Sequence, residues 1–191
     1  MQRRSILAGL GIWGLGCPAL QAQPAPGSVT DMAMLARQGG VLLIRHASTE
    51  PGLGDPPGFR LGQCSTQRNL SDAGRAESRA MGEWFRRHGL QPQAVRSSQW
   101  CRCQDTARLA FGRAEDWPAL NSTFAGQGEP EQQLRELRER LQRWPLGTLE
   151  VWVTHQVIMT ALTGAYPALG EGFLVDAQGK LRARGMMAAA S

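Results

Sequence analysis

The 191-residue sequence has no long block of like charge, no internal repeat and no extended linker. Such features mark multidomain chains, repeat proteins and disordered tails, so their absence predicts a single globular domain. Lysine is nearly absent, because Lys180 is the only one and arginine supplies the rest of the basic charge. Arginine suits bidentate contacts with oxyanions, although genome composition explains its excess equally well. The formal net charge of +5 is modest, and nucleic acid is not expected as a partner.

One apolar stretch, over residues 6–16, lies near the N-terminus and is too short to form a stable membrane span. Arg3 and Arg4 precede it, and Ala22 follows small residues that suit a cleavage point. The paired arginines resemble a twin-arginine signal, which directs export after folding. We therefore expect an export signal over residues 1–22 and a protein that resides in the periplasm or outside the cell.

Removal of this signal would leave a leader over residues 23–29 and a single domain over residues 30–191. Cys17 offers another interpretation of the N-terminus, as the anchor of a lipoprotein. Gly14 stands where lipoprotein signals usually carry leucine, and Pro18 follows the cysteine directly, so lipidation is disfavoured.

Three cysteines remain after such processing, namely Cys64, Cys101 and Cys103. In an oxidising compartment one pair is expected to form a disulfide. Cys101 and Cys103 are too close in sequence for a comfortable bridge, so Cys64 is expected to pair with one of them. A zinc site made by these thiols and a histidine is the alternative, but a Cys-x-Cys spacing without a second pair disfavours it.

Hydrophobic periodicity predicts alternating helices and strands. Helices are expected over residues 30–38, 71–89, 102–111, 131–144 and 157–162, and strands over residues 41–44, 94–98, 120–124, 149–154, 173–175 and 181–183. The last two strands are expected to form a hairpin at the edge of the sheet. The alternation predicts an α/β fold, a three-layer sandwich with a mostly parallel central sheet flanked by helices.

Groups that bind anions follow three of the predicted strands. Arg45 and His46 follow the first strand, Arg102 comes soon after the second, and His155 follows the strand that ends at residue 154. Because the carboxyl ends of parallel strands meet at one edge of a sheet, these four side chains are expected to lie close together. Two arginines and two histidines around one point would bind a tetrahedral dianion. The sequence therefore predicts a phosphate pocket.

These strand ends fall within four motifs, which stand at residues 45–47, 70–78, 97–107 and 153–155. In content and order the motifs resemble those of the histidine phosphatase superfamily, which includes phosphoglycerate mutases and phytases. The family's Arg-His-Gly reads Arg-His-Ala here, its Leu-Thr-x-x-Gly-x-x-Gln-Ala is matched loosely, and its Ser-Ser-Pro-x-x-Arg-x-x-Gln-Thr-Ala lacks the proline. The resemblance covers residues 41–164 and implies a phosphoglycerate mutase-like fold.

The resemblance also implies a division of roles. His46 is the expected nucleophile, which attacks phosphorus to give a phosphohistidine that water then cleaves. Arg45, Arg102 and His155 are expected to bind the phosphoryl oxygens of the substrate and to neutralise charge in the transition state. Nearby arginines favour the neutral imidazole, which is the form that attacks. This arrangement requires neither a metal ion nor another cofactor.

The acid that protonates the leaving oxygen is not identified by the motifs. In the mutase-like branch it stands in a Leu-x-Glu context after a strand, but residues 120–122 read Leu-Asn-Ser here. The candidates that remain are Glu129, Glu131, Asp55, Glu50 and Asp105, and the alternative is that none of them serves. An enzyme without a strong acid would be limited to good leaving groups, such as acyl phosphates, phosphohistidines or acidic sugar phosphates.

Together these residues predict an exported, metal-independent phosphomonoester phosphatase, similar to the histidine acid phosphatases, that acts on a phosphorylated small molecule or glycan. A phosphomutase is less expected, because its sugar bisphosphate activators are cytosolic. A phosphate-recognising binding protein, which keeps the pocket without turnover, is the alternative from a different class. The loop at residues 51–68 is expected either to wall the pocket, with Arg60 and Arg68 as further anion contacts, or to be a rigid surface loop. The oligomeric state is left open.

Overall fold

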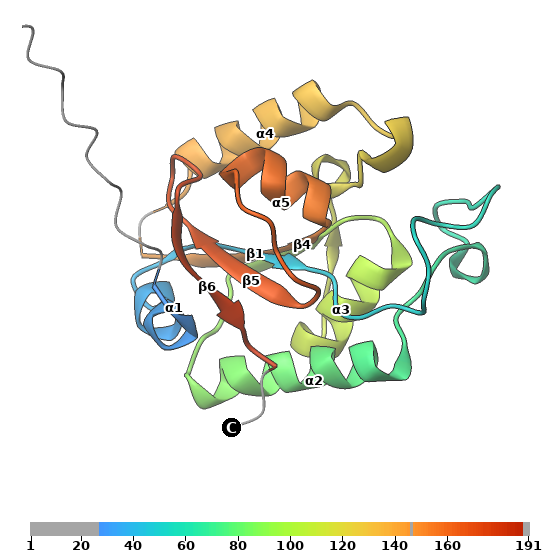
Figure 1. The fold of residues 1–191 in the computed structure, drawn as a ribbon. Coiled ribbons are helices and arrows are strands. Elements are labelled where there is room, and N and C mark those ends of the chain that lie inside the picture. The colour runs from blue at the N-terminus through green and yellow to red at the C-terminus, as the bar shows by residue number, and fades with distance from the viewer. Residues whose placement is uncertain (1–26, 146, 189–191) are drawn as a thin grey trace, which may run out of the picture.

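The computed structural model describes residues 27–145 and 147–188. They form a six-stranded sheet, in the order β3-β2-β4-β1-β5-β6, with helices on both faces (Figure 1). The predicted three-layer α/β sandwich is confirmed. The predicted export signal at residues 1–22 and Cys17 lie outside the described residues, as does most of the predicted leader.

Three parallel strands form the centre of the sheet and end at the same edge. β1 (Gly40–Arg45) pairs with β4 (Leu149–Thr154) in a register that places Arg45 beside Thr154. β2 (Ala94–Ser97) pairs with the other side of β4 in the same direction. The residues that directly follow these strands are therefore neighbours in space.

The remaining strands complete the two sides of the sheet. β5 (Glu171–Val175) runs antiparallel to β1, and β6 (Leu181–Met186) runs antiparallel to β5, which confirms the predicted C-terminal hairpin. β3 (Glu115–Asp116) pairs with β2 in parallel at the opposite edge. The sheet is thus mostly parallel, as the alternation of elements predicted.

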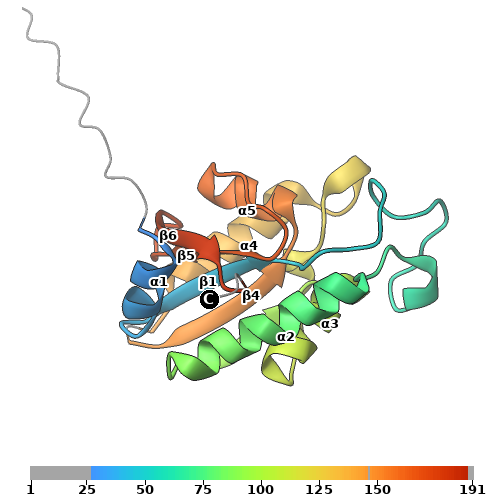
Figure 2. The same cartoon turned by 60° about the horizontal axis from the view of Figure 1, so that its bottom comes forward.

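Helices cover both faces of the sheet, as Figure 2 shows. α1 (Val29–Ala36), α2 (Asp72–Arg87) and α3 (Cys101–Phe111) pack on one face, and α4 (Pro130–Gln142) and α5 (Gln156–Thr163) pack on the other. The five predicted helices are therefore present, with ends that differ from the expected ones by a few residues.

The side chains of β1 alternate between the two apolar cores. Leu42 and Ile44 are buried with α1, α2 and α3, whereas Val41 and Leu43 are buried with α4 and α5. A strand covered on both faces has no solvent side, which explains why its sequence is continuously apolar.

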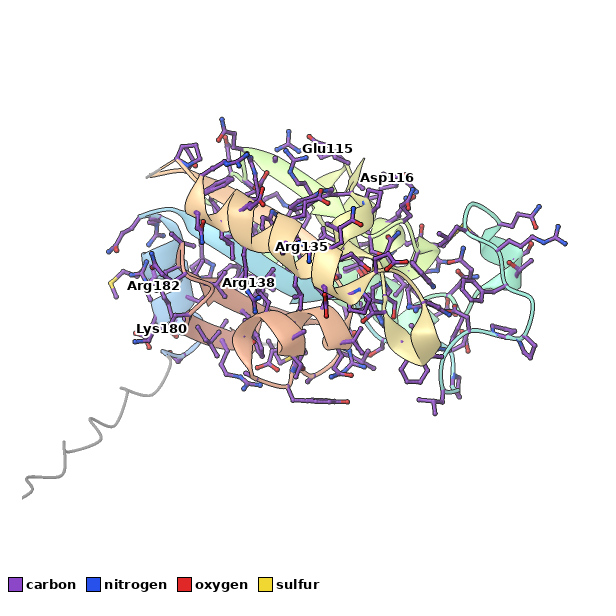
Figure 3. All side chains as sticks on the ribbon, turned by 90° about the horizontal axis from the view of Figure 1, so that it is seen from above. Glu115, Asp116, Arg135, Arg138, Lys180 and Arg182 are labelled. Atoms are coloured by element: carbon purple, nitrogen blue, oxygen red, sulfur yellow. A yellow bond between two sulfur atoms is a disulfide. The ribbon has the colours of Figure 1, made fainter. Side chains whose placement is uncertain are left out.

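Helix α4 is strongly charged because only one of its sides meets the sheet. Leu137 and Leu141 are buried in the core, while Arg135 and Arg138 are exposed on the outer side of the helix (Figure 3). None of the described helices combines the length and the apolar character needed to cross a membrane.

Two glycines allow α2 to approach its neighbours closely. A Cβ on Gly74 would lie 1.8 Å from the carbonyl oxygen of Ser48, and a Cβ on Gly82 would lie 2.2 Å from that of Ala110. The first contact seats the segment after His46 on α2, and the second joins α2 to α3. Gly74 is the glycine of the second motif, and this close approach is its physical role.

The strand predicted over residues 120–124 is wrong. The chain forms two 3₁₀ turns there, Pro118–Leu120 and Phe124–Gly126, and the edge strand is β3 instead. Leu120 is fully buried, so its apolar character serves core packing from a turn that begins with a proline. Ala125 has φ of 58°, a left-handed conformation that a strand does not contain.

Candidate active site

A pocket lies at the edge where the parallel strands end. Its wall includes all four side chains predicted to bind phosphate, namely Arg45, His46, Arg102 and His155. The rings of the two histidines meet edge to face, with 5.5 Å between their centroids. The structure thus brings together groups that lie up to 110 residues apart (155 minus 45) in the sequence.

His46 directly follows β1 and is only 3% exposed. Its Nδ1 lies 2.9 Å from the carbonyl oxygen of Ala47, so Nδ1 holds the ring proton and donates it, and Nε2 is left unprotonated. Burial, followed by the positive charge of Arg102, lowers the pKa of His46 to about 3. The imidazole is therefore neutral near pH 7 and keeps a lone pair on Nε2.

The backbone after His46 is held from two helices. Thr106 of α3 accepts a hydrogen bond from the amide of Ala47 at 3.1 Å. Glu77 of α2 accepts from both the amide and the hydroxyl of Ser48, at 3.0 and 2.8 Å. These bonds fix the nucleophile candidate, and they give a positioning role to Thr106 of the third motif and Glu77 of the second.

His155 follows β4 and is held by Ser98. Ser98 Oγ donates to Asn121 Oδ1 at 3.2 Å, accepts a bond from the amide of Trp100 and lies 2.8 Å from His155 Nε2. The last contact engages Nε2 and fixes the orientation of the ring. Burial, and then the charge of Arg102, holds the pKa of His155 well below its ordinary value. The ring is therefore neutral near pH 7.

Three guanidinium groups line the pocket, those of Arg45, Arg68 and Arg102. Arg45 donates to the carbonyl oxygen of Pro167 at 2.9 Å, and Arg68 donates to Thr49 Oγ1 at 2.7 Å. The Nε atoms of Arg45 and Arg102 are buried without a hydrogen-bond partner, which is uncommon for buried polar atoms. The three guanidinium groups are the cations that an oxyanion in the pocket would meet.

Asp55 is the one carboxylate that lines the pocket among the residues described. Its Oδ1 accepts from Arg102 Nη1 at 2.7 Å and from the amide of Arg68 at 3.0 Å, and its Oδ2 accepts from Trp100 Nε1 at 2.9 Å. Burial alone would raise the pKa of Asp55, but the hydrogen bond and charge of Arg102 lower it overall. Asp55 is thus ionised, and a group in this state is unsuited to donate a proton.

The other four candidate acids lie outside the pocket wall. Glu50, Glu129 and Glu131 are exposed, and Asp105 forms an ion pair with α2. Ser122, which stands where the mutase-like branch has glutamate, does line the pocket. Over residues 27–145 and 147–188, no three His, Cys, Asp or Glu side chains are grouped so that they could hold a metal ion.

Comparison with known proteins identifies the family. The model of the histidine phosphatase superfamily (branch 1) matches residues 41–153. The chain belongs to the histidine phosphatase superfamily. No curated protein matches it significantly.

Two solved structures illustrate the likeness of fold. Protein histidine phosphatase SixA, complexed with tungstate, is 17% identical with a TM-score of 0.54, over 77% of this chain and 96% of that chain. The alpha-ribazole phosphatase from Shigella flexneri is 15% identical with a TM-score of 0.54, over 79% of this chain and 98% of that chain. At such identities the likeness concerns the fold.

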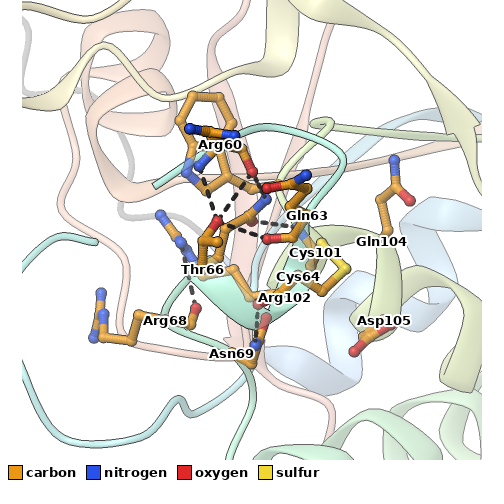
Figure 4. Close-up of a disulfide and its surroundings, with 12 residues drawn as sticks. Arg60, Gln63, Cys64, Thr66, Arg68, Asn69, Cys101, Arg102, Gln104 and Asp105 are labelled. Atoms are coloured by element: carbon orange, nitrogen blue, oxygen red, sulfur yellow. Dashed lines mark hydrogen bonds between the residues drawn. A yellow bond between two sulfur atoms is a disulfide. The ribbon is translucent and has the colours of Figure 1, made fainter. Parts of the chain in front are cut away.

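In this member of the superfamily, the loop at residues 51–68 is fastened to the start of α3. Cys64 and Cys101 form a disulfide with their Cα atoms 5.6 Å apart (Figure 4). Gln67 Oε1 accepts a hydrogen bond from the amide of Cys101 at 2.9 Å. The pairing left open between two partners is therefore resolved, and Cys103 is a buried free thiol.

The same loop forms a wall of the pocket through Leu53, Gly54, Asp55 and Arg68. Arg68 also holds the loop together, because its Nε donates to the carbonyl oxygen of Gly54 at 2.8 Å. Arg60 is exposed and does not line the pocket, so the expectation of an anion contact there is wrong. It follows the turn at residues 56–59, where the amide of Phe59 donates to the carbonyl oxygen of Pro56.

Sequence reasoning missed the residues at the mouth of the pocket. Leu53, Phe124 and Tyr166 line it, from three separate loops, and none of them belongs to a family motif. The one signal available for Tyr166 is that it is the only tyrosine in the chain. The role of Ser98 was also missed, although it stands in the third motif.

Proposed function

We propose that this protein is an exported phosphomonoester phosphatase that works through a phosphohistidine formed on His46. The observation that carries the proposal is the buried, neutral imidazole of His46, whose proton is fixed on Nδ1 in a pocket lined by three arginines. A neutral ring nitrogen is the form that attacks phosphorus, and guanidinium groups bind the phosphoryl oxygens that surround it.

The reaction has two steps. In the first, the Nε2 lone pair of His46 forms a bond to phosphorus while the bond from phosphorus to the leaving oxygen breaks, and its electron pair stays on that oxygen. In the second, a water oxygen attacks phosphorus, the N–P bond breaks and its electrons return to Nε2. The water supplies one proton, which the leaving oxygen or the released phosphate takes up through solvent. Two easier steps thus replace one difficult step.

The other polar groups of the pocket bind the phosphoryl group or position the residues that bind it. Arg45 and Arg102 donate from their guanidinium groups to the phosphoryl oxygens and neutralise charge in the transition state. His155 adds a further contact to the phosphoryl group, and Ser98 holds its ring in place through Nε2. Asp55 positions Arg102 and does not act as the acid. The reaction therefore proceeds without a strong carboxylic acid and favours good leaving groups.

The proposed substrate is a phosphorylated small molecule or glycan, and the proposed location is the periplasm or the outside of the cell. The N-terminal pattern of residues 1–22 supports export, and the disulfide of Cys64 with Cys101 suits an oxidising compartment.

Hydrolysis of 4-nitrophenyl phosphate, with and without a chelator, tests the proposal. We expect turnover that resists the chelator and is lost in His46→Ala. After rapid quenching, labelled enzyme should carry a phosphoryl group that is stable in alkali and released in acid. An acid-stable adduct, or turnover that needs a metal ion, would refute the mechanism.

The second candidate is a phosphate-binding protein without turnover. The absence of a free carboxylic acid from the described pocket wall favours it, because the leaving oxygen then lacks a strong proton donor. Tight binding of inorganic phosphate or vanadate, with no release of 4-nitrophenol above the rate of His46→Ala, is the result that this candidate predicts.

A further inference from the structure

Exposed apolar side chains gather at the mouth of the pocket. Among the described residues, five large apolar side chains are exposed, and three of them line this pocket: Leu53 at 88%, Phe124 at 43% and Tyr166 at 64%. We call these three the apolar rim. The other two, Met34 and Leu61, lie away from the pocket. Scattered exposed apolar residues need no explanation, but their concentration around one cavity indicates a binding surface.

The rim is built by close packing between loops. Phe124 lies against the loop that carries Leu53, because a Cβ on Gly54 would be 3.3 Å from Phe124 Cε1. Ala125, also in the wall, is the one non-glycine residue with positive φ in residues 27–145 and 147–188. Such a conformation is unfavourable for an alanine, and strained residues of this kind cluster at functional sites.

Tyr166 ties the rim to the charged floor of the pocket. The guanidinium carbon of Arg45 lies 6.0 Å from the centroid of the Tyr166 ring. A phosphate group held by Arg45 would therefore have its organic substituent within reach of the rim, because the arginines and the rim line the same pocket. Gln127 and Gln156 add polar contacts, but no free carboxylate lines the described wall for a network of sugar hydroxyls.

We propose that the apolar rim binds an aromatic ring, so that the substrate is an aryl phosphate monoester. This proposal rests on the phosphatase function proposed above and narrows its substrate class. A flat ring fits against Phe124, Tyr166 and Leu53 by stacking and apolar contact.

The charged residues at the bottom of the pocket also favour aryl phosphate monoesters. When the P–O bond of an aryl phosphate breaks, the electron pair is delocalised over a phenolate, whose conjugate acid has a pKa of about 10. Such a group leaves without prior protonation far more readily than an alkoxide does. The Asp55 carboxylate is paired with Arg102 and does not supply a proton, so the site suits a leaving group that needs none.

The test compares the binding of phenylphosphonate and methylphosphonate, which are not hydrolysed, by calorimetry. In the native protein we expect phenylphosphonate to bind about tenfold more tightly, as partial burial of a ring implies. Leu53→Ala and Tyr166→Ala should each reduce that ratio about threefold or more. Leu61→Ala is the matched control, because Leu61 is an exposed leucine of the same loop that lies outside the pocket, and it should leave the ratio unchanged.

Equal binding of the two phosphonates, or tighter binding of glucose 6-phosphate than of phenylphosphonate, overturns the aromatic assignment. A ratio that the two rim variants do not change overturns the rim as its source. Phenyl phosphate that binds with the expected preference but is never hydrolysed overturns the proposed function instead. The two failures are therefore distinguishable.

Discussion

Replacing Asp55 with asparagine tests whether this residue positions Arg102 or protonates the leaving group. The side chains of Asp55 and Arg102 are each 4% exposed, and they are 2.7 Å apart. Removing one partner of a buried ion pair costs about 3–5 kcal/mol, because the other charge is left uncompensated. This pair borders an open pocket, where water screens part of the loss. We therefore expect Asp55→Asn to lower the free energy of unfolding by about 2–4 kcal/mol.

Asparagine keeps one oxygen to accept from Arg102 but loses the charge and one acceptor. With its oxygen toward Arg102 and the amide of Arg68, its NH₂ group would face the indole N–H of Trp100, which is also a donor. One contact must break in either orientation of the amide. Urea unfolding measures the loss, and Glu131→Gln is the control, since that candidate acid is 95% exposed and should change stability by less than about 0.5 kcal/mol.

Kinetics separate the two roles. A positioning residue affects every substrate, so kcat/KM should fall by a similar factor for 4-nitrophenyl phosphate and for an alkyl phosphate. A general acid matters mainly when the leaving group is poor. The positioning role is refuted if Asp55→Asn spares 4-nitrophenyl phosphate while it lowers alkyl phosphate turnover about tenfold more, with native stability.

Three further predictions concern the histidines and the disulfide. Ser98→Ala removes the hydroxyl that holds the His155 ring at Nε2, so kcat should fall about 10–100-fold, and Ser98→Thr, which keeps a hydroxyl, should lose less. Because the pKa of His46 is lowered to about 3, the unfolded chain binds a proton below pH 6.5 that the native ring refuses. His46 alone should therefore lower native stability by about 2 kcal/mol from pH 7 to pH 5, and His155 should add a loss of the same sign, so the fall should be about 2 kcal/mol smaller in His46→Gln. Cys64→Ser removes a disulfide whose cysteines are 37 residues apart, so the free energy of unfolding measured in urea should fall by about 3–4 kcal/mol. Cys103 is a free, buried thiol, so its replacement breaks no disulfide.

The parts of the fold that could be predicted from the sequence are those with a strong local pattern. β1 and β4 are apolar on both faces and stop at His46 and His155, so their type and the place of the pocket follow from periodicity and from the geometry of parallel strands. The segment at residues 120–124 shares that apolar character, but Pro118 and the left-handed Ala125 make it a pair of turns. A local pattern predicts that Leu120 is buried, but it does not predict whether Leu120 belongs to a strand or to a turn.

The site could be predicted where a motif marks it and not where loops meet. Asp55 was one of five candidate acids, and only its contact with Arg102, 47 residues away in sequence, reveals its role. Tyr166 reaches the pocket because the link between α5 and β5 passes beside Arg45. Such encounters depend on the course of long loops, which periodicity does not encode.

The charges of the described pocket residues indicate a further role for Asp55. Arg45, Arg68 and Arg102 carry three positive charges, Asp55 carries one negative charge and both histidines are neutral, so the net charge of these groups is +2 (3 minus 1). A phosphate monoester carries about −1.5 to −2 near pH 7, which matches this charge, whereas a diester carries a single negative charge and leaves one guanidinium uncompensated. Asp55→Asn would raise the charge to +3. Inorganic phosphate should then bind more tightly and be released more slowly, even as Arg102 loses its fixed orientation.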